Sequence, residues 1–347
     1  MIGERVRHAR IYHGWTQERL ADLIGKSQAA VHKIEKGDTI APDTLASIAR
    51  ETQFAPWFFE RGPLPDLPKG SLRFRKRATA TVRDDEKIRA HVRQAIEVIG
   101  DLEQKLPGGA HLPVVRVRPV TPDVEITDDF IEALALASRE WLGVGPTDPI
   151  PNLTRAVERA GVTVIGSSQE IQKHEGASYW PDFPSGRPII CLSRGRPGDK
   201  HRLSLAHELG HFLLHQLRDN EGDSQVIEAQ AFRFAGALLL PRDVVFTEIE
   251  PPVVMRDLGL IKAKYGISIA ALVRRCLDLG LITSSRRESL EKQISARGWR
   301  KDEPVLVRPE QPRFVRDIVK ASVGTDHPAK LHPILGLPPL AIRDMLT

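Results

Sequence analysis

The sequence predicts a multidomain protein: an all-α helical bundle, then an α+β domain, then a helical or irregular C-terminal extension. Three observations lead to this fold class. The 347 residues are roughly twice the length of a usual domain. The first sixty residues have helical periodicity, whereas β-branched runs alternate with helical stretches further on. Hydrophobic residues at 41% and charged residues at 27% exclude a disordered or collagen-like chain.

Breaks in these patterns mark the expected domain boundaries. Two prolines and a glycine interrupt the first helical pattern over residues 64–70, and an amphipathic helix is expected over 84–105. The β-branched runs at 162–165 and 188–192 are the expected strands. We therefore expect a first domain over 1–63, a basic linker and connecting helix over 64–112, an α+β domain over 113–283 and a partly proline-rich extension over 284–347.

Composition also limits the cellular setting. The sequence has no run of about 18 apolar residues, and its charged N-terminus is unlike a secretory signal, so we expect a cytoplasmic protein without a membrane partner. Cys191 and Cys276 are far apart in apolar surroundings, which favours buried core thiols over a disulfide or a thiolate metal site. The net charge of +5 permits a polyanionic partner without requiring one.

Residues 15–35 predict two helices joined by a tight turn. Thr16 caps the first helix, Gly25 ends it and Ser27 caps the second. The expected inward positions are Leu20, Ala21, Leu23, Val31 and Ile34. The second helix then presents its other positions outward, where a recognition helix enters a DNA major groove. These positions are Gln28, Ala29, His32 and Lys33.

This segment resembles the Xre/Cro-repressor helix-turn-helix family over roughly residues 1–59. The matching positions are Arg10, Gly14, Thr16, Gln17, Leu20, Ala21, Gly25, Gln28, Ile34, Glu35 and Gly37. The resemblance implies a double-stranded DNA operator as partner and phosphate contacts from Arg10 and Gln17. It also implies a DNA-facing surface of Ser27, Gln28, Ala29, His32 and Lys33. Gln28 would pair with adenine, and binding to half-sites favours a homodimer.

The charge balance keeps an alternative open for this domain. Residues 1–60 hold eight basic and eight acidic side chains, which would also suit a helical bundle that packs on protein. The basic run over 69–77 would supply missing phosphate contacts, although such runs are often only solvated. Its members are Lys69, Arg73, Arg75, Lys76 and Arg77.

The strongest chemical signal is the sequence from His207 to His211, His-Glu-Leu-Gly-His. Residues four apart lie on one face of a helix, so both imidazoles can bind one zinc ion while Glu208 faces the water bound there. The flanking residues are apolar, and unpaired His and Glu would be costly in a buried helix. His215 follows one turn later, but one helix cannot wrap three turns around a tetrahedral ion. We expect His215 behind the ligands or at the surface.

A zinc hydrolase needs a third protein ligand and an open fourth position. Glu228 lies seventeen residues after His211, at the start of the apolar helical segment 226–241. That is enough chain for a second helix to return antiparallel and to aim Glu228 at the metal. His207, His211 and Glu228 would then form the two-histidine, one-carboxylate set of gluzincin-like peptidases.

These residues resemble the ImmA/IrrE metallopeptidase family, in which the HExxH helix is followed by a helix ending in Leu-Leu-x-Pro. The corresponding residues here are 206–211 and 228–241, and the likeness extends over roughly 162–283. The resemblance implies a zincin-like α+β fold. Many relatives have a glutamate where this chain has Gln230, and a ligand at that position would leave the site impaired. Counting back from Pro241 favours Glu228.

The chemistry follows from this set of ligands. Zinc would lower the pKa of its bound water towards about 7, and Glu208 would take the proton and pass it to the leaving amine. Tyr179 is the preferred second donor to the oxyanion. The alternatives are His174, His201 and Arg202, of which Arg202 is expected instead to orient the metal helix. Manganese or another divalent ion would also suit these ligands.

We therefore expect a bacterial or phage transcription regulator with a zinc endopeptidase domain. By resemblance its substrate is a transcriptional repressor, whose cleavage would derepress genes of a stress response or a mobile element. Tethering the protease at the operator would raise its effective concentration near that repressor. One alternative is a non-catalytic sensor or dimerisation scaffold, against which the intact Glu208 argues. Another is self-cleavage within residues 64–70.

Overall fold

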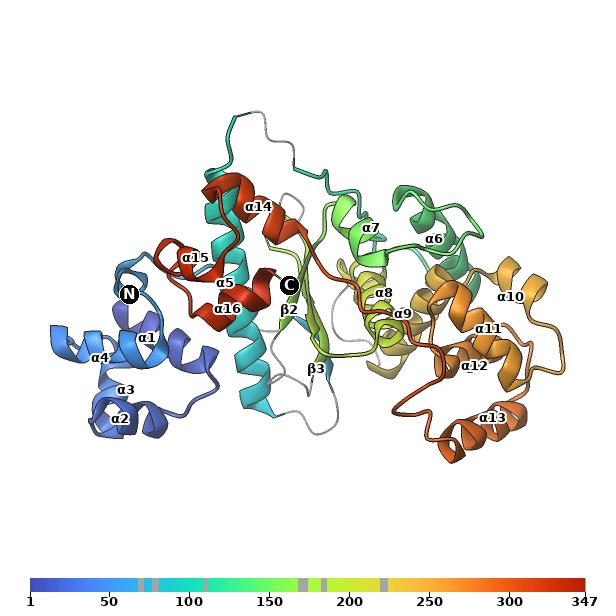
Figure 1. Ribbon diagram of the computed structural model, residues 1–347, viewed down its shortest axis with the longest axis horizontal. Helices are drawn as coiled ribbons and strands as arrows, with labels where there is room; N and C mark the ends of the chain where they lie inside the picture. Colours follow the sequence, from blue (N-terminus) through green and yellow to red (C-terminus); the bar gives the residue numbers. More distant parts are fainter. Residues whose placement is uncertain are drawn as a thin grey trace. The chain divides into compact units, whose positions relative to one another are not determined.

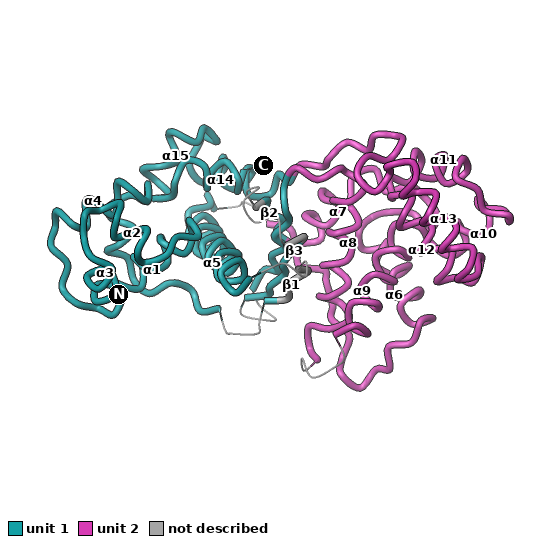
Figure 2. Tube along the Cα trace, turned by 90° about the horizontal axis from the view of Figure 1, so that it is seen from below, with its two compact units in different colours: residues 1–111, 163–194, 312–347 teal, residues 112–162, 195–311 magenta. Residues whose placement is uncertain are grey.

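The computed structural model describes residues 1–67, 72–76, 81–108, 112–167, 174–181, 186–218 and 224–346. The chain forms two compact units (Figure 2). The first comprises Met1–His111, Thr163–Arg194 and Pro312–Thr347, and the second comprises Leu112–Val162 and Gly195–Gln311. Within the described ranges, no helix combines the length and the apolar character that a membrane crossing requires.

The first unit begins with α1 (Ile2–Tyr12), α2 (Gln17–Ile24), α3 (Gln28–Lys36), α4 (Pro42–Thr52) and the 3-10 helix η1 (Pro56–Glu60). The predicted caps are present. Thr16 accepts a hydrogen bond from the Arg19 N–H, and Ser27 accepts one from the Ala30 N–H. Gly25 has a φ of 65°, a left-handed conformation that favours glycine. Both α1 and α2 pack on α3, so this segment folds as helix, turn and helix.

A long helix and a small sheet continue the first unit. α5 (Val82–Gln104) starts with a capping box between Thr81 and Asp84. Within the described residues the sheet has the strand order β1-β3-β4-β2. The strands are β1 (Arg73–Lys76), β2 (Thr163–Ser167), β3 (His174–Tyr179) and β4 (Ile189–Ser193). β3 is antiparallel to both neighbours and β4 is parallel to β2. α5 packs on α1 and also contacts β3 (Figure 1).

Three helices near the C-terminus complete the first unit: α14 (Phe314–Val323), α15 (Pro328–Leu335) and α16 (Pro339–Leu346). Prolines begin α15 and α16, where their fixed φ suits the first helical turn. α14 and α16 pack on β2. The Trp57 indole donates to the Pro333 carbonyl over 3.2 Å. Gly336 has a φ of 72°, and a Cβ there would lie 2.8 Å from the Trp57 ring, so a side chain would not fit.

The second unit is helical within the described residues. Its helices are α6 (Asp128–Trp141), α7 (Leu153–Arg159), α8 (Gly198–His215), α9 (Ser224–Leu239), α10 (Arg242–Glu248), α11 (Met255–Tyr265), α12 (Ile269–Asp278) and α13 (Ser284–Ala296). α8 packs along α9, which also contacts α6 and α12. A Cβ on Gly210 would lie 3.0 Å from the Phe234 ring and 3.3 Å from the Ala231 carbonyl oxygen. The absence of a side chain at Gly210 therefore lets α9 approach α8 closely.

Two glutamates after α13 bind the N-termini of other helices in the second unit. Glu303 accepts hydrogen bonds from the Ile269 N–H over 2.7 Å and from the Lys262 ammonium over 2.8 Å. Glu310 accepts from the backbone N–H groups of Leu153 and Thr154 at the start of α7. These N–H groups have no partner within the helix, so each carboxylate satisfies donors that would otherwise be unbonded.

Candidate metal centre and DNA-binding surface

α8 places His207 and His211 one turn apart on the same helical face. Their Nε2 atoms are 3.0 Å apart, and both side chains are buried. Glu208 lies between them in sequence and is also fully buried. The predicted HExxH segment is therefore a helical turn inside the second unit, with both imidazoles on one side.

Glu228 on α9 completes the group. Its Oε2 lies 3.3 Å from His207 Nε2, and its Oε1 lies 3.3 Å from His211 Nε2. One ligand atom from each of the three residues lies within 4.8 Å of the others. Two imidazole nitrogens and one carboxylate oxygen suit zinc and other divalent ions, and three protein ligands leave a coordination position for water. The donor set therefore fits a metal of the predicted class.

The pKa of the Glu228 carboxyl group is lowered. Partial burial is the largest single effect and acts in the opposite direction, raising the pKa. The hydrogen bonds and charges of His207 and His211 together outweigh it. Glu228 is therefore a carboxylate, the form that binds a cation. Its side chain is 39% exposed, so solvent reaches the group from this side.

Gln230, the alternative ligand position, does not join this group. Its Oε1 lies 3.0 Å from His215 Nε2, and His215 Nδ1 lies 3.1 Å from His211 Nδ1. His215 is buried behind the histidine pair and is not at the surface. The geometry thus brings Glu228, and not Gln230, to His207 and His211.

Phe232 on α9 contributes packing to the centre. Its ring centroid lies 4.3 Å from that of His207, which limits the rotation of the imidazole. The sequence indicates Phe232 only as part of an apolar stripe, because spacing alone does not tell which core residue touches a ligand.

The proposed oxyanion donors are placed as follows. Tyr179 ends β3 in the first unit and is half-buried, whereas the three clustered residues belong to the second unit. Its catalytic role stays a prediction. His174 begins β3, and its side chain lies outside the described residues. His201 on α8 is half-buried, and burial lowers its pKa.

Arg202 on α8 has several partners in the second unit. Its guanidinium donates to Glu310 over 2.5 Å and to the carbonyl oxygens of Ile150 and Tyr265 over 2.9 and 3.3 Å. These contacts hold the N-terminal half of α8, which agrees with the expectation that Arg202 orients the metal helix.

The positions that are expected to face DNA lie along one helix. On α3 the side chains expected to face DNA are all exposed, and we call this surface the α3 face. Its residues are Ser27, Gln28, Ala29, His32 and Lys33. Val31 and Ile34 of the same helix are buried, so α3 is held by its apolar side and offers its polar side to solvent. Ser27 also serves as the N-cap, with its oxygen 3.2 Å from the Ala30 nitrogen.

Arg10 and Gln17, the proposed phosphate contacts, both bind Glu35. Arg10 donates to Glu35 through two nitrogens and to the Trp15 carbonyl oxygen over 2.7 Å. Gln17 donates to Glu35 over 2.7 Å. In the structure these contacts fasten α1 and α2 to α3, and phosphate binding by Arg10 and Gln17 stays a prediction. The sequence pattern names Glu35 but does not indicate that it joins three helices.

The predicted basic run is only partly described. The backbone of residues 73–76 forms β1, while the side chains of that strand, together with Lys69 and Arg77, lie outside what the structure describes. A contact of this run with DNA stays a prediction.

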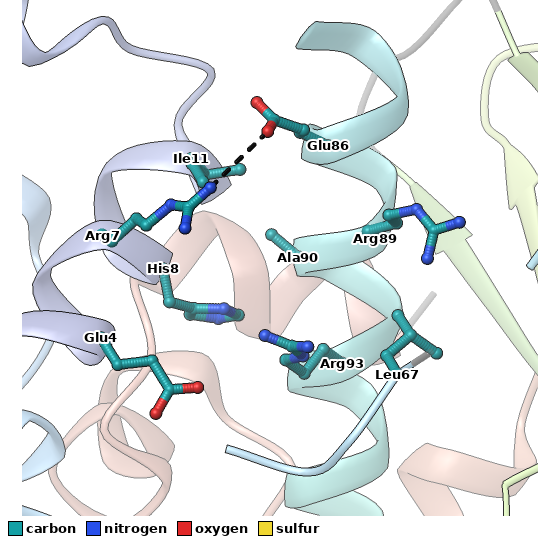
Figure 3. Close-up of a pocket in the computed structure, with 9 residues that line it drawn as sticks. All are labelled: Glu4, Arg7, His8, Ile11, Leu67, Glu86, Arg89, Ala90 and Arg93. Carbon is teal, nitrogen blue, oxygen red and sulfur yellow. Dashed lines mark ion pairs between the residues drawn. The ribbon is translucent and has the colours of Figure 1, made fainter. Parts of the chain in front are cut away.

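A cavity of about 260 Å³ lies between α1 and α5 in the first unit (Figure 3). Arg7 and Glu86 form a 3.9 Å ion pair at its edge. His8 is buried and hydrogen-bonded to Gln94 over 3.0 Å. Burial, with smaller effects of Arg93 and Arg5, lowers the pKa of His8 to about 3. The neutral, hydrogen-bonded imidazole of His8 therefore belongs to the packing of α1 on α5.

Together, a helix-turn-helix with an exposed recognition face and a His/His/Glu group on paired helices define a DNA-binding protein with a metallohydrolase-like centre. Comparison with protein-family models agrees. Residues 6–54 match the family described as Helix-turn-helix, and residues 157–277 match the metallopeptidase family described as IrrE N-terminal-like domain. The curated proteins give no match.

The chain therefore contains a helix-turn-helix DNA-binding domain of the Xre/Cro type and an IrrE N-terminal-like peptidase domain. The two resemblances and the fold class predicted from the sequence are confirmed.

Proposed function

We propose that this protein is a transcription regulator with a zinc-dependent endopeptidase domain that cleaves a transcriptional repressor. The observation that carries the proposal is the grouping of His207, His211 and Glu228 within 4.8 Å, in a chain that also has a helix-turn-helix domain. A buried HExxH helix with a carboxylate brought to it by a second helix is a costly arrangement for a purely structural domain.

In this proposal His207, His211 and Glu228 hold the metal. When bound, zinc supplies an acidified water and polarises the scissile carbonyl of the substrate. Glu208 accepts the proton of the attacking water and delivers it to the leaving amine. Tyr179 is the proposed donor to the developing oxyanion. Manganese is the alternative metal for the same ligands.

The DNA-binding part of the proposal uses the α3 face. Gln28 reads an adenine in the major groove, and Arg10 and Gln17 support the contact at the phosphates. A homodimer places two such faces on the two half-sites of an operator. Binding there raises the effective concentration of the peptidase around a repressor on the same DNA.

The first test is the metal content of the purified full-length protein after zinc loading and removal of excess ion. Elemental analysis is expected to give about one zinc per chain, lost in Glu228→Ala and retained in the exposed-glutamate control Glu250→Ala. A wild-type protein without zinc, or a Glu228→Ala variant that keeps it, would contradict the metal centre.

The second test separates an enzyme from a scaffold. Glu208→Gln is expected to retain zinc and DNA binding but to lose hydrolysis, because it removes the general base and keeps the ligands. Wild-type and variant proteins are incubated with the proteome of the cells that encode them, and new N-termini are mapped. New termini in a DNA-binding repressor with the wild type alone support the proposal. Identical maps with both proteins support the non-catalytic sensor or scaffold.

The same two proteins distinguish self-cleavage from cleavage of another protein. Wild-type protein with added zinc is followed on a gel beside Glu208→Gln. A loss of intact wild-type chain with a new terminus in residues 64–70 would make the chain its own substrate.

A further inference from the structure

Behind the metal centre, a line of polar contacts runs from His211 through His215 to Gln230. His211 and His215 are 3% and 2% exposed. His211 Nδ1 lies 3.1 Å from His215 Nδ1, and His215 Nε2 lies 3.0 Å from the Gln230 side-chain oxygen. Each ring nitrogen in this line therefore has a side-chain partner at hydrogen-bond distance.

The protons on this line have only one arrangement that suits a metal ligand. His211 Nε2 faces His207 and Glu228, so it must be unprotonated to bind a cation. A neutral imidazole then carries its proton on Nδ1, and His211 donates to His215 Nδ1. The single proton of a neutral His215 consequently lies on Nε2 and is donated to the Gln230 oxygen.

The reversed arrangement would block the site. If the Gln230 amide nitrogen faced His215, it would donate to Nε2, and His215 would in turn donate from Nδ1 to His211 Nδ1. His211 would then carry its proton on Nε2, the atom that faces Glu228. The direction of the whole line is therefore decided by which end of the Gln230 amide is turned to His215.

We propose that His215 and Gln230 are positioning residues that fix the tautomer and the ring orientation of His211 for metal binding. The inference rests on the metal centre proposed above. Outer hydrogen-bond acceptors of this kind orient a ligating histidine and increase its basicity. Here the line has a neutral amide at its end, and α9 supplies both Glu228 as ligand and Gln230 as support.

Zinc affinity tests the line. The Kd is measured by competition with a chromophoric chelator for the full-length wild type, Gln230→Leu, Gln230→Glu and His215→Phe. Gln230→Leu and His215→Phe remove an acceptor, and each is expected to weaken zinc binding about 10- to 100-fold. Gln230→Glu keeps an acceptor and is expected to bind at least as tightly as the wild type. Thermal unfolding in excess chelator checks that the metal-free variants fold alike.

The tautomer itself gives a readout that does not depend on enzyme activity. Long-range ¹H–¹⁵N spectra of histidine-labelled, metal-free protein at neutral pH are expected to show a protonated Nδ1 on His211 and a protonated Nε2 on His215. In Gln230→Leu the protonated Nε2 form of His211 is expected to increase. The wild-type spectrum decides the direction of the line even if a variant does not fold.

These experiments distinguish a failure of the positioning role from a failure of the metal centre. Wild-type zinc affinity in both Gln230→Leu and His215→Phe, or an Nε2-protonated His211 in the wild type, overturns the positioning role and leaves the metal centre intact. Absence of zinc from the wild type itself contradicts the metal centre, and the tautomers of the metal-free protein still decide whether the line exists.

Discussion

Arg10 and Glu35 form a two-pronged ion pair in which Arg10 Nε lies 2.5 Å from Oε1 and Nη2 lies 2.9 Å from Oε2. The pair links α1 to α3, and its side chains are only 12% and 4% exposed. Two parallel hydrogen bonds fix direction as well as distance. The orientation of α3 in the DNA-binding domain therefore depends on a side chain that is not on the α3 face.

We predict that Glu35→Ala lowers the free energy of unfolding by about 2–4 kcal/mol, because it leaves the largely buried Arg10 guanidinium unpaired. Urea denaturation followed by circular dichroism measures the change. The control is Glu51→Ala, since the Arg50 side chain in that pair is 70% exposed, and its effect is expected to stay within about 0.5 kcal/mol. Equal effects of the two substitutions would contradict a structural role for Glu35.

Gln28→Ala is expected to weaken binding to the preferred DNA sequence by about 1–3 kcal/mol and to relax the preference at one base pair. The sequence is first selected with wild-type protein from random oligonucleotides, and affinities are then measured by fluorescence anisotropy at fixed salt. Gln104→Ala, at an exposed position on α5, serves as the control. An unchanged base preference would show that the α3 face does not read DNA through Gln28.

His8 predicts a loss of stability in mild acid. Burial lowers its pKa from 6.5 to about 3. Between these two pH values His8 is therefore protonated in the unfolded chain but stays neutral in the folded protein. Stability therefore falls as the pH decreases from 6.5 towards 3, by up to about 1.4 kcal/mol per pH unit. His8→Gln should reduce the difference in unfolding free energy between pH 7 and pH 5 by about 2 kcal/mol. Urea titrations at both pH values measure it, and an exposed-histidine variant, His327→Gln, should retain the wild-type difference.

Glu310→Ala is expected to destabilise the second unit by about 3–5 kcal/mol, because it leaves the buried Arg202 charge uncompensated. It also removes the acceptor for two N–H groups of α7. Thermal unfolding measured with and without zinc checks the prediction, and zinc affinity is expected to fall as α8 loses the anchor at Arg202. An unfolding curve like that of the exposed variant Glu250→Ala would refute it.

Local signals in the sequence predict much of the structure of the DNA-binding domain and of the metal centre. Thr16, Gly25 and Ser27 predict the helix ends because capping depends on neighbouring backbone groups. The spacing of His207 and His211 predicts their shared face, since four residues make about one helical turn. The helix that carries Glu228 is also visible in the apolar pattern, and the structure brings Glu228 to both histidines.

Contacts between distant segments cannot be predicted from such local signals. The hydrogen-bond donors Arg10 and Gln17 suggest contacts with DNA phosphates, yet both bind Glu35, because the packing of three helices decides which acceptor is near. The contact between His215 and Gln230 depends on how closely α9 approaches α8, and spacing does not encode this distance. The sequence predicts a helical or irregular C-terminal part. In the structure prolines begin α15 and α16, and α16 packs on β2, which is far away in sequence.

The discontinuity of the first unit determines when it can fold during synthesis. Its third segment, with α14, α15 and α16, leaves the ribosome only after every residue of the second unit has been made. Until then β2 lacks its contacts with α14 and α16, and Trp57 lacks its contact with Gly336. The second unit can thus reach its native packing before the first, although the DNA-binding helices are translated at the start, which reverses the usual N-terminal-first order of domain folding.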